Sequence, residues 1–109
     1  MNTRTKGRLL ELRAEKELNL DDWITYRVKG TTRFNKNVDI FGEFDILAVK
    51  KGIHKYIQIK ANQKPGPKDI ARLKELHKKY FGPKTVFEWW TYWNRGKRKS
   101  KQGWEKILI

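Results

Sequence analysis

A two-residue turn between two apolar segments limits the possible folds of this chain more than any other part of its sequence. Residues 43–49 form an apolar run interrupted by one aspartate, and residues 56–60 form a second apolar run. Both runs are typical of β-strands. The dipeptide Lys51-Gly52 between them is typical of a tight hairpin turn. The sequence therefore predicts an antiparallel hairpin whose register is set by the turn.

The predicted hairpin brings polar side chains together on a sheet that is otherwise apolar. A turn centred on that dipeptide places Asp45 opposite Gln58 and Glu43 opposite Lys60. Directly opposed residues have Cβ atoms about 5 Å apart. Because side chains alternate between the two faces of a strand, Gln58 and Lys60 share one face. A carboxylate, an amide and an ammonium group are thus expected to meet on one patch of the sheet.

The rest of the chain predicts two helices and three further strands. Residues 3–19 predict a helix whose apolar stripe includes Leu18, and Glu11 falls on the same stripe. In the second predicted helix, Leu73 and Tyr80 lie on the apolar face. We expect one domain, residues 1–109, of the α/β class, with a central mixed β-sheet flanked by helices. The expected order is helix 3–19, strands 23–28, 43–49 and 56–60, helix 68–81, and strands 85–93 and 104–109.

The charge of the chain indicates a polyanionic partner. Its 26 Lys and Arg against 12 Asp and Glu give a formal net charge of +14, more than solubility requires. Nucleic acid is the favoured partner, and an anionic membrane surface is the weaker alternative. No apolar stretch approaches the roughly 20 residues of a membrane span, and no secretory signal is visible. We therefore expect a cytoplasmic protein that does not insert into membranes.

The composition also limits the kind of metal site. The chain has no cysteine and only two histidines, which excludes disulfides and makes a histidine-rich zinc site implausible. Mg²⁺ instead takes oxygen ligands, usually a few carboxylates together with water and substrate phosphate. Carboxylates in a predicted core therefore favour Mg²⁺, or Mn²⁺, over zinc.

The polar residues near the hairpin fit the hydrolysis of a phosphodiester bond. This reaction needs an activated water and stabilisation of negative charge on the phosphate, and a divalent cation supplies both. Glu11, Asp45 and Gln58 would supply side-chain oxygens to the cation, together with the backbone carbonyl of Ile59. Lys60 would orient the attacking water or offset the charge of the phosphate. The sequence therefore predicts a Mg²⁺-dependent nuclease site.

Simpler interpretations of the same residues stay open. A glutamate on a helix stripe, such as Glu11, more often lies at the edge of the stripe or in an ion pair. An ionised aspartate in an apolar strand needs a partner, and for Asp45 that partner could be Lys60 in a structural salt bridge. Strand alternation alone accounts for Gln58 and Lys60. The combination of all four residues is more specific than any one of them.

Four short segments resemble the PD-(D/E)xK nuclease superfamily, and most of all its archaeal Holliday junction resolvases. These segments are Lys-Gly-Arg-Leu-Leu-Glu at 6–11, Tyr-Arg-Val-Lys-Gly-Thr at 26–31, Phe-Asp-Ile-Leu-Ala at 44–48 and Ile-Gln-Ile-Lys at 57–60. The resemblance implies a restriction-endonuclease-like core and the catalytic set Glu11, Asp45, Gln58 and Lys60. It also implies cleavage of DNA that leaves a 5′-phosphate and a 3′-hydroxyl.

Two features depart from the resolvase pattern. Gln58 stands where the superfamily usually has glutamate, which removes one negative charge and should weaken metal binding. The stretch before Asp45 is longer than in resolvases, and residues 38–45 are similar to segments of phage-encoded nucleases of the superfamily. Asp39 in that stretch is a candidate additional acidic residue, although a turn or surface role is more common. The departures bear on junction specificity more than on nuclease chemistry.

Basic residues near the predicted site, and a basic run after residue 94, are candidate contacts to phosphate, with Thr31 as a neutral donor. The aromatic residues on both faces of strand 85–93 predict core packing on one face and a homodimer contact on the other. Base stacking is the less favoured alternative for these aromatics. We expect DNA as the partner, with branched DNA as one option. The predicted contact residues are Arg8, Thr31, Arg33, Lys36, Lys64, Lys68, Arg95, Lys97, Arg98 and Lys99.

Two other functions fit the same sequence. One is a catalytically inactive protein of the same fold, in which Gln58 marks a decayed metal site and the basic loops only hold nucleic acid. The other is a basic RNA-binding module that stacks bases on exposed aromatic rings. Metal-dependent nicking of plasmid or branched DNA separates the nuclease from both.

Overall fold

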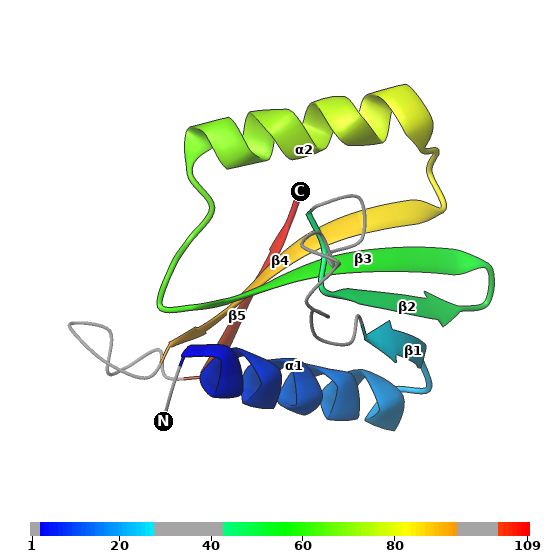
Figure 1. The fold of residues 1–109 in the computed structure, drawn as a ribbon. Coiled ribbons are helices and arrows are strands. Elements are labelled where there is room, and N and C mark those ends of the chain that lie inside the picture. The colour runs from blue at the N-terminus through cyan, green and yellow to red at the C-terminus, as the bar shows by residue number, and fades with distance from the viewer. Residues whose placement is uncertain (1–2, 28–42, 94–102) are drawn as a thin grey trace, which may run out of the picture.

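In a computed structural model, which describes residues 3–27, 43–93 and 103–109, the chain forms two helices and five strands (Figure 1). Their order is the one predicted from the sequence. The helix boundaries differ from the expected ones by one residue, and the strand boundaries by up to three. The elements are α1 (Thr3–Leu20), β1 (Ile24–Arg27), β2 (Ile46–Lys50), β3 (Ile53–Ala61), α2 (Pro67–Tyr80), β4 (Thr85–Trp93) and β5 (Gly103–Leu108).

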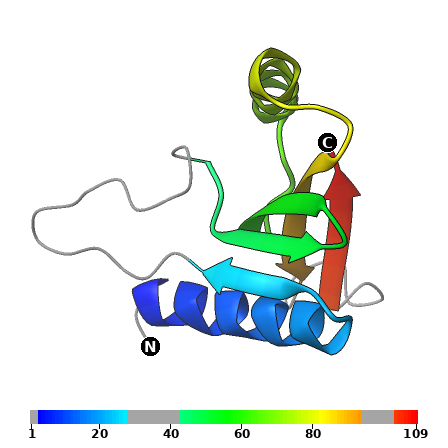
Figure 2. The ribbon, with the colours of Figure 1, turned by 90° about the vertical axis from the view of Figure 1, so that its right-hand side faces the viewer.

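The five strands form one sheet in the order β1-β2-β3-β4-β5, with a helix on each face. All neighbouring strands pair antiparallel except β3 and β4, which pair parallel. A parallel pair needs a crossover connection, and α2 forms it on the face opposite α1 (Figures 1 and 2). The predicted α/β fold with a central mixed sheet is thus confirmed. Neither helix in the described ranges is long and apolar enough to cross a membrane.

The hairpin between β2 and β3 has the predicted turn and register. Lys51 and Gly52 adopt φ angles of 50° and 82°, as a two-residue type I′ turn requires. Leu47 pairs with Tyr56, which is the register expected from a turn centred there. The regular strand begins only at Ile46, however, so the expectation of a strand from residue 43 was wrong.

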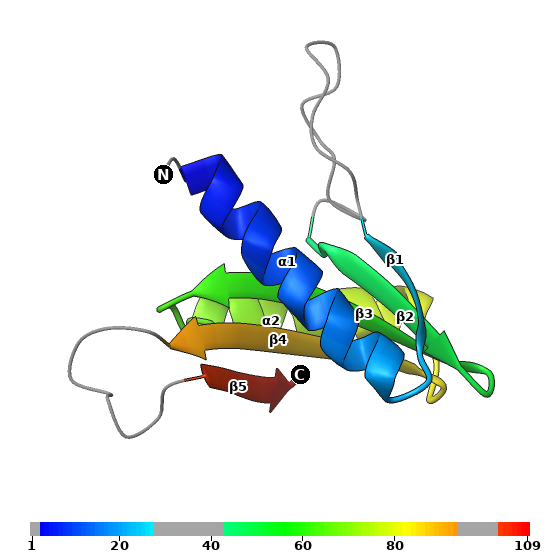
Figure 3. The same cartoon turned by 90° about the horizontal axis from the view of Figure 1, so that it is seen from below.

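One half of the core lies between α1 and the sheet. Ala14 and Leu18 of α1 are buried at 0% and 4% exposure, and they pack with Ile57, Ile59 and Trp90. Seen from below, α1 crosses the sheet diagonally (Figure 3). Because α1 covers the face of Ile57 and Ile59, the strand alternation directs their neighbours in β3 to the opposite face.

The other half of the core lies between the sheet and α2. Leu73 of α2 packs with Phe44, Phe87 and Trp89, all of which are buried. The helix starts with proline in its first turn and ends with basic residues, as helix geometry and the helix dipole favour. The expectation that Tyr80 packs on this face was wrong, because it lies in the last turn and is 70% exposed.

Both faces of β4 are covered by the chain itself. Trp90 packs in the core on the α1 side and Trp89 in the core on the α2 side. The sequence predicted a homodimer contact from the aromatic residues on both faces of this strand, but packing within the chain accounts for both faces. The homodimer therefore loses its main support and stays a prediction.

Candidate active site

Asp45 lies just before β2, at a point where the regular alternation of side chains between the two sheet faces is interrupted. Phe44 is buried on the α2 side of the sheet and Ile46 on the α1 side, although residues two apart in a regular strand share one face. At this irregular point the backbone N–H of Asp45 donates to the carbonyl of Ile57 at 2.9 Å. Its side chain reaches β3, where Oδ2 accepts a hydrogen bond from the Ile59 N–H at 2.8 Å. Asp45 is thereby held against β3.

Gln58 and Lys60 of β3 face a polar cavity of about 210 Å³ between the sheet and α2. The side-chain oxygen Oε1 of Gln58 is buried and has no hydrogen-bond partner among the residues that the structure describes. Leaving a buried polar atom unpaired costs about 1–3 kcal/mol, so an unsatisfied oxygen at a cavity is a candidate position for a bound ion or water. The remaining lining residues are Glu43, Gln63, Asp69, Arg72, Leu73 and Trp89.

An ion cluster forms the outer wall of this cavity. The Arg72 guanidinium donates two hydrogen bonds to Glu43, including one of 3.2 Å from Nη2 to Oε1, and Nη2 lies 3.1 Å from Asp69 Oδ1. The N–H of Gly66, which donates to Asp69 Oδ2 at 2.9 Å, lowers the pKa of Asp69 most; desolvation opposes this effect, and Arg72 and Lys60 lower the pKa further. The hydrogen bond to Glu43 raises the pKa of Arg72. Asp69 and Arg72 therefore form a charged pair at neutral pH.

Glu11 approaches the same end of the sheet from the α1 side. Its Oε1 lies 3.8 Å from Nη1 of Arg27, and the Glu11 side chain is 22% exposed. Arg27 pairs directly with Ile46, the residue that follows Asp45. The helix itself lies on the face opposite Gln58, so Glu11 could reach the Gln58 cavity only past the end of β2. The structure thus places Glu11 and Asp45 at one end of the sheet on adjoining elements.

The donor set is suited to a hard cation rather than to zinc. Within the described ranges, no group of three or more His, Cys, Asp or Glu side chains lies close enough together to hold a metal. The predicted set contains only two carboxylates, Glu11 and Asp45, so it is not a cluster of that kind. Its other donors are an amide oxygen and a backbone carbonyl, and Mg²⁺ and Ca²⁺ both accept such oxygens. The unpaired Oε1 of Gln58 fits a ligand of this type.

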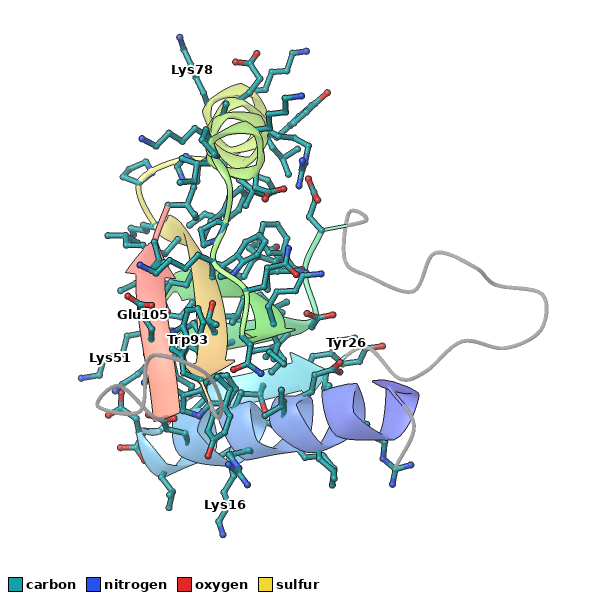
Figure 4. The ribbon with its side chains drawn as sticks, turned by 90° about the vertical axis from the view of Figure 1, so that its left-hand side faces the viewer. Lys16, Tyr26, Lys51, Lys78, Trp93 and Glu105 are labelled. Atoms are coloured by element: carbon teal, nitrogen blue, oxygen red, sulfur yellow. The ribbon has the colours of Figure 1, made fainter. Side chains whose placement is uncertain are left out.

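Basic side chains surround the fold on its outer faces. Lys16 on α1 and Lys78 on α2 point away from the sheet in opposite directions (Figure 4). Of the predicted phosphate contacts, Arg8 and Lys68 are exposed, and Lys64 is 43% exposed at 4.0 Å from Glu105. Asp39 and the remaining predicted phosphate contacts lie outside the described residues. These contacts are Thr31, Arg33, Lys36, Arg95, Lys97, Arg98 and Lys99.

A larger cavity, of about 280 Å³, lies away from these residues, between the end of α1 and β5. Four of its charged groups form two ion pairs: Lys55 pairs with Glu88 at 3.2 Å, and Lys106 pairs with Glu17 at 2.6 Å. Lys106 also lies 4.3 Å from the centre of the Trp90 ring. Within the described ranges, none of the predicted site residues lines this cavity, whereas Gln58 and Lys60 line the smaller one.

Sequence reasoning missed the ion cluster of Glu43, Asp69 and Arg72. Asp69 and Arg72 are spaced so that they meet on one helix, which the sequence does show. Nothing local links Arg72 to Glu43, because they are brought together only by the packing of α2 over Phe44.

Comparisons with known proteins identify the fold and not a sequence family. No protein-family profile matches the chain, and no curated protein matches it significantly. The structure is similar to that of Hjc, a Holliday junction resolvase from the archaeal hyperthermophile Archaeoglobus fulgidus. The TM-score is 0.60 and the sequence identity 16%, over 94% of this chain and 72% of the resolvase. The chain therefore has a restriction-endonuclease-like fold.

Proposed function

We propose that the protein is a metal-dependent endonuclease that hydrolyses phosphodiester bonds in DNA. The observation that carries this proposal is the buried Oε1 of Gln58, which has no partner among the described residues; Gln58 lines the same cavity as Lys60 and lies on the strand that holds Asp45. The fold shared with a Holliday junction resolvase supports the same reaction. The net charge of +14 supports a polyanionic substrate.

Each residue has a definite part in the proposed reaction. Asp45 and Glu11 would hold Mg²⁺ or Mn²⁺ through carboxylate oxygens, with Oε1 of Gln58 and the carbonyl of Ile59 as neutral ligands. When bound, the cation lowers the pKa of water and neutralises charge that develops on the phosphate. Lys60 would place its ammonium group beside the phosphate or the attacking water.

The substrate proposed is DNA, with branched DNA as the form that the resolvase fold favours. The basic residues on the outer faces of both helices would contact phosphates without reading sequence. A homodimer would offer two such sites to a symmetric junction. The branched substrate and the homodimer extend the proposal beyond the single site.

Nicking assays test the proposal directly. We expect the purified protein to cleave supercoiled plasmid or a synthetic four-way junction in Mg²⁺ or Mn²⁺, and not in EDTA, because hydrolysis depends on the cation. The products should carry 5′-phosphate ends, which a kinase can label only after phosphatase treatment. Tight, salt-dependent DNA binding without cleavage in either metal would instead identify a catalytically inactive binding protein. Preference for single-stranded RNA would favour the RNA-binding module.

The Gln58→Glu variant tests whether this side chain is a ligand. A carboxylate in place of the amide adds a negative charge at the cavity, so we expect Mn²⁺ to bind about tenfold more tightly. Titration with Mn²⁺ monitored by electron paramagnetic resonance measures the affinity. Gln63→Glu is the matched control, because Gln63 lines the same cavity but is exposed. An equal gain in both variants would mean that the charge acts at a distance and that Gln58 is no ligand.

A further inference from the structure

We infer that Arg72 is a positioning residue for Asp45, acting through Glu43. This inference rests on the proposed function, in which Asp45 is a metal ligand, and it extends that function to a residue on α2. Arg72 is expected neither to touch the substrate nor to bind the cation. Its effect is to fix the backbone on the N-terminal side of Asp45.

The first reason is that Asp45 is not held by regular strand pairing. The chain turns over between Phe44 and Ile46, whose side chains are both fully buried on opposite faces of the sheet. The direction of the Asp45 carboxylate therefore depends on its hydrogen bond from the Ile59 N–H and on where its two neighbours are held. Ile46 is held by strand pairing in β2 and by the core between the sheet and α1. Phe44 is held by the core between the sheet and α2.

The second reason is the geometry of the contact between Arg72 and Glu43. The Nε and Nη2 groups of Arg72 bind the two carboxylate oxygens of Glu43 as a fork, which fixes orientation as well as distance. Glu43 is two residues before Asp45, and its side chain is only 19% exposed. Asp69 holds the guanidinium from the other side at 3.1 Å. The cluster thus ties α2 to the segment that leads into Asp45.

The third reason is that the contact between Arg72 and Glu43 and the packing of Phe44 both act on the segment just before Asp45. The Phe44 ring lies 4.6 Å from that of Phe87 and 5.6 Å from that of Tyr56. Packing fixes the position of Phe44, but a ring in an apolar core can rotate or shift slightly. The two hydrogen bonds from Arg72 to Glu43 restrain the backbone one residue earlier. Loss of a contact that orients a metal ligand typically changes metal affinity 10–100-fold.

Direct binding of Mn²⁺ alone, without DNA, tests the inference. We expect Glu43→Gln and Arg72→Ala each to weaken Mn²⁺ binding about tenfold, measured by electron paramagnetic resonance well below the unfolding temperature. Arg72→Lys, which retains the charge but not the fork, should fall between Arg72→Ala and wild type. It also serves if Arg72→Ala does not fold. A merely structural cluster would lower the unfolding temperature and leave the affinity of the folded protein unchanged, which would overturn the inference.

Two further variants separate this inference from the proposed function. Glu17→Gln breaks a comparable ion pair with Lys106, which joins α1 to β5 on the other side of the sheet, and should not change Mn²⁺ affinity. Asp45→Asn should abolish binding. If it does, but the Glu43 and Arg72 variants bind Mn²⁺ like wild type, the inference fails and the proposed function stands. If the wild-type protein binds no Mn²⁺, both fail.

Discussion

Asp45→Asn is expected to reduce metal-dependent cleavage at least about a thousandfold, which corresponds to about 4 kcal/mol of transition-state stabilisation. The substitution removes one of only two carboxylates proposed to hold the cation. The asparagine oxygen can still accept the hydrogen bond from the Ile59 N–H, so the fold should remain intact. Rates of plasmid nicking at saturating Mg²⁺ measure the effect, and circular dichroism checks the fold.

The Asp45→Asn variant is also expected to keep its affinity for DNA. Binding of the variant to a labelled junction in Ca²⁺ or EDTA should change little, because phosphate contacts are made by basic residues elsewhere. Asp22→Asn is the matched control: it removes the same charge at an exposed residue with a φ of 66°, a conformation that asparagine tolerates. Full activity of Asp45→Asn would refute the proposed site. Loss of folding together with activity would instead identify a structural aspartate.

Phe87→Ala is expected to destabilise the protein by about 3–5 kcal/mol. Phe87 is 1% exposed and lies at the centre of the core under α2. Its ring is 4.6 Å from that of Phe44, 5.1 Å from that of His77 and 5.4 Å from that of Phe81. Truncation leaves a cavity that these rings cannot fill. Because small domains are stable by only about 5–15 kcal/mol, this loss is a large fraction, and urea unfolding measures it.

The control for this prediction is Leu108→Ala on the neighbouring strand. Leu108 pairs through β5 with Glu88 and is 71% exposed, so its truncation should cost less than about 0.5 kcal/mol. Phe87→Leu should lose less stability than Phe87→Ala, since it leaves a smaller cavity. Equal stability of Phe87→Ala and wild type would show that α2 does not pack on the sheet as described.

Local patterns predicted the order of the elements and the hairpin register. The type I′ turn at Lys51-Gly52 requires positive φ angles at both of its residues, and that geometry sets which residues face one another across β2 and β3. Apolar spacing in residues 3–19 likewise predicted the buried position of Leu18. These features depend on residues close in sequence, so the sequence contains all the information needed. The same reasoning placed Gln58 and Lys60 on one face, and they line one cavity.

Other features were not predictable because they depend on distant contacts. The apolar run predicted a strand from residue 43. Burial of Phe44 between the sheet and α2 instead interrupts the regular strand at Asp45. Aromatic residues on both faces of β4 predicted an intermolecular contact, but the two helices cover both faces. In each case a local pattern is compatible with several environments, and the packing of the second helix selects one of them.

The sequence by itself determined an α/β fold, a basic surface and a hairpin that carries Asp45, Gln58 and Lys60. Only the tertiary structure decided that Glu11 approaches from the opposite face and that Arg72 holds Glu43 beside the cavity. The physical reason is that turn geometry and side-chain alternation act within a few residues. The position of one helix relative to another is set by the shape of the core that they share.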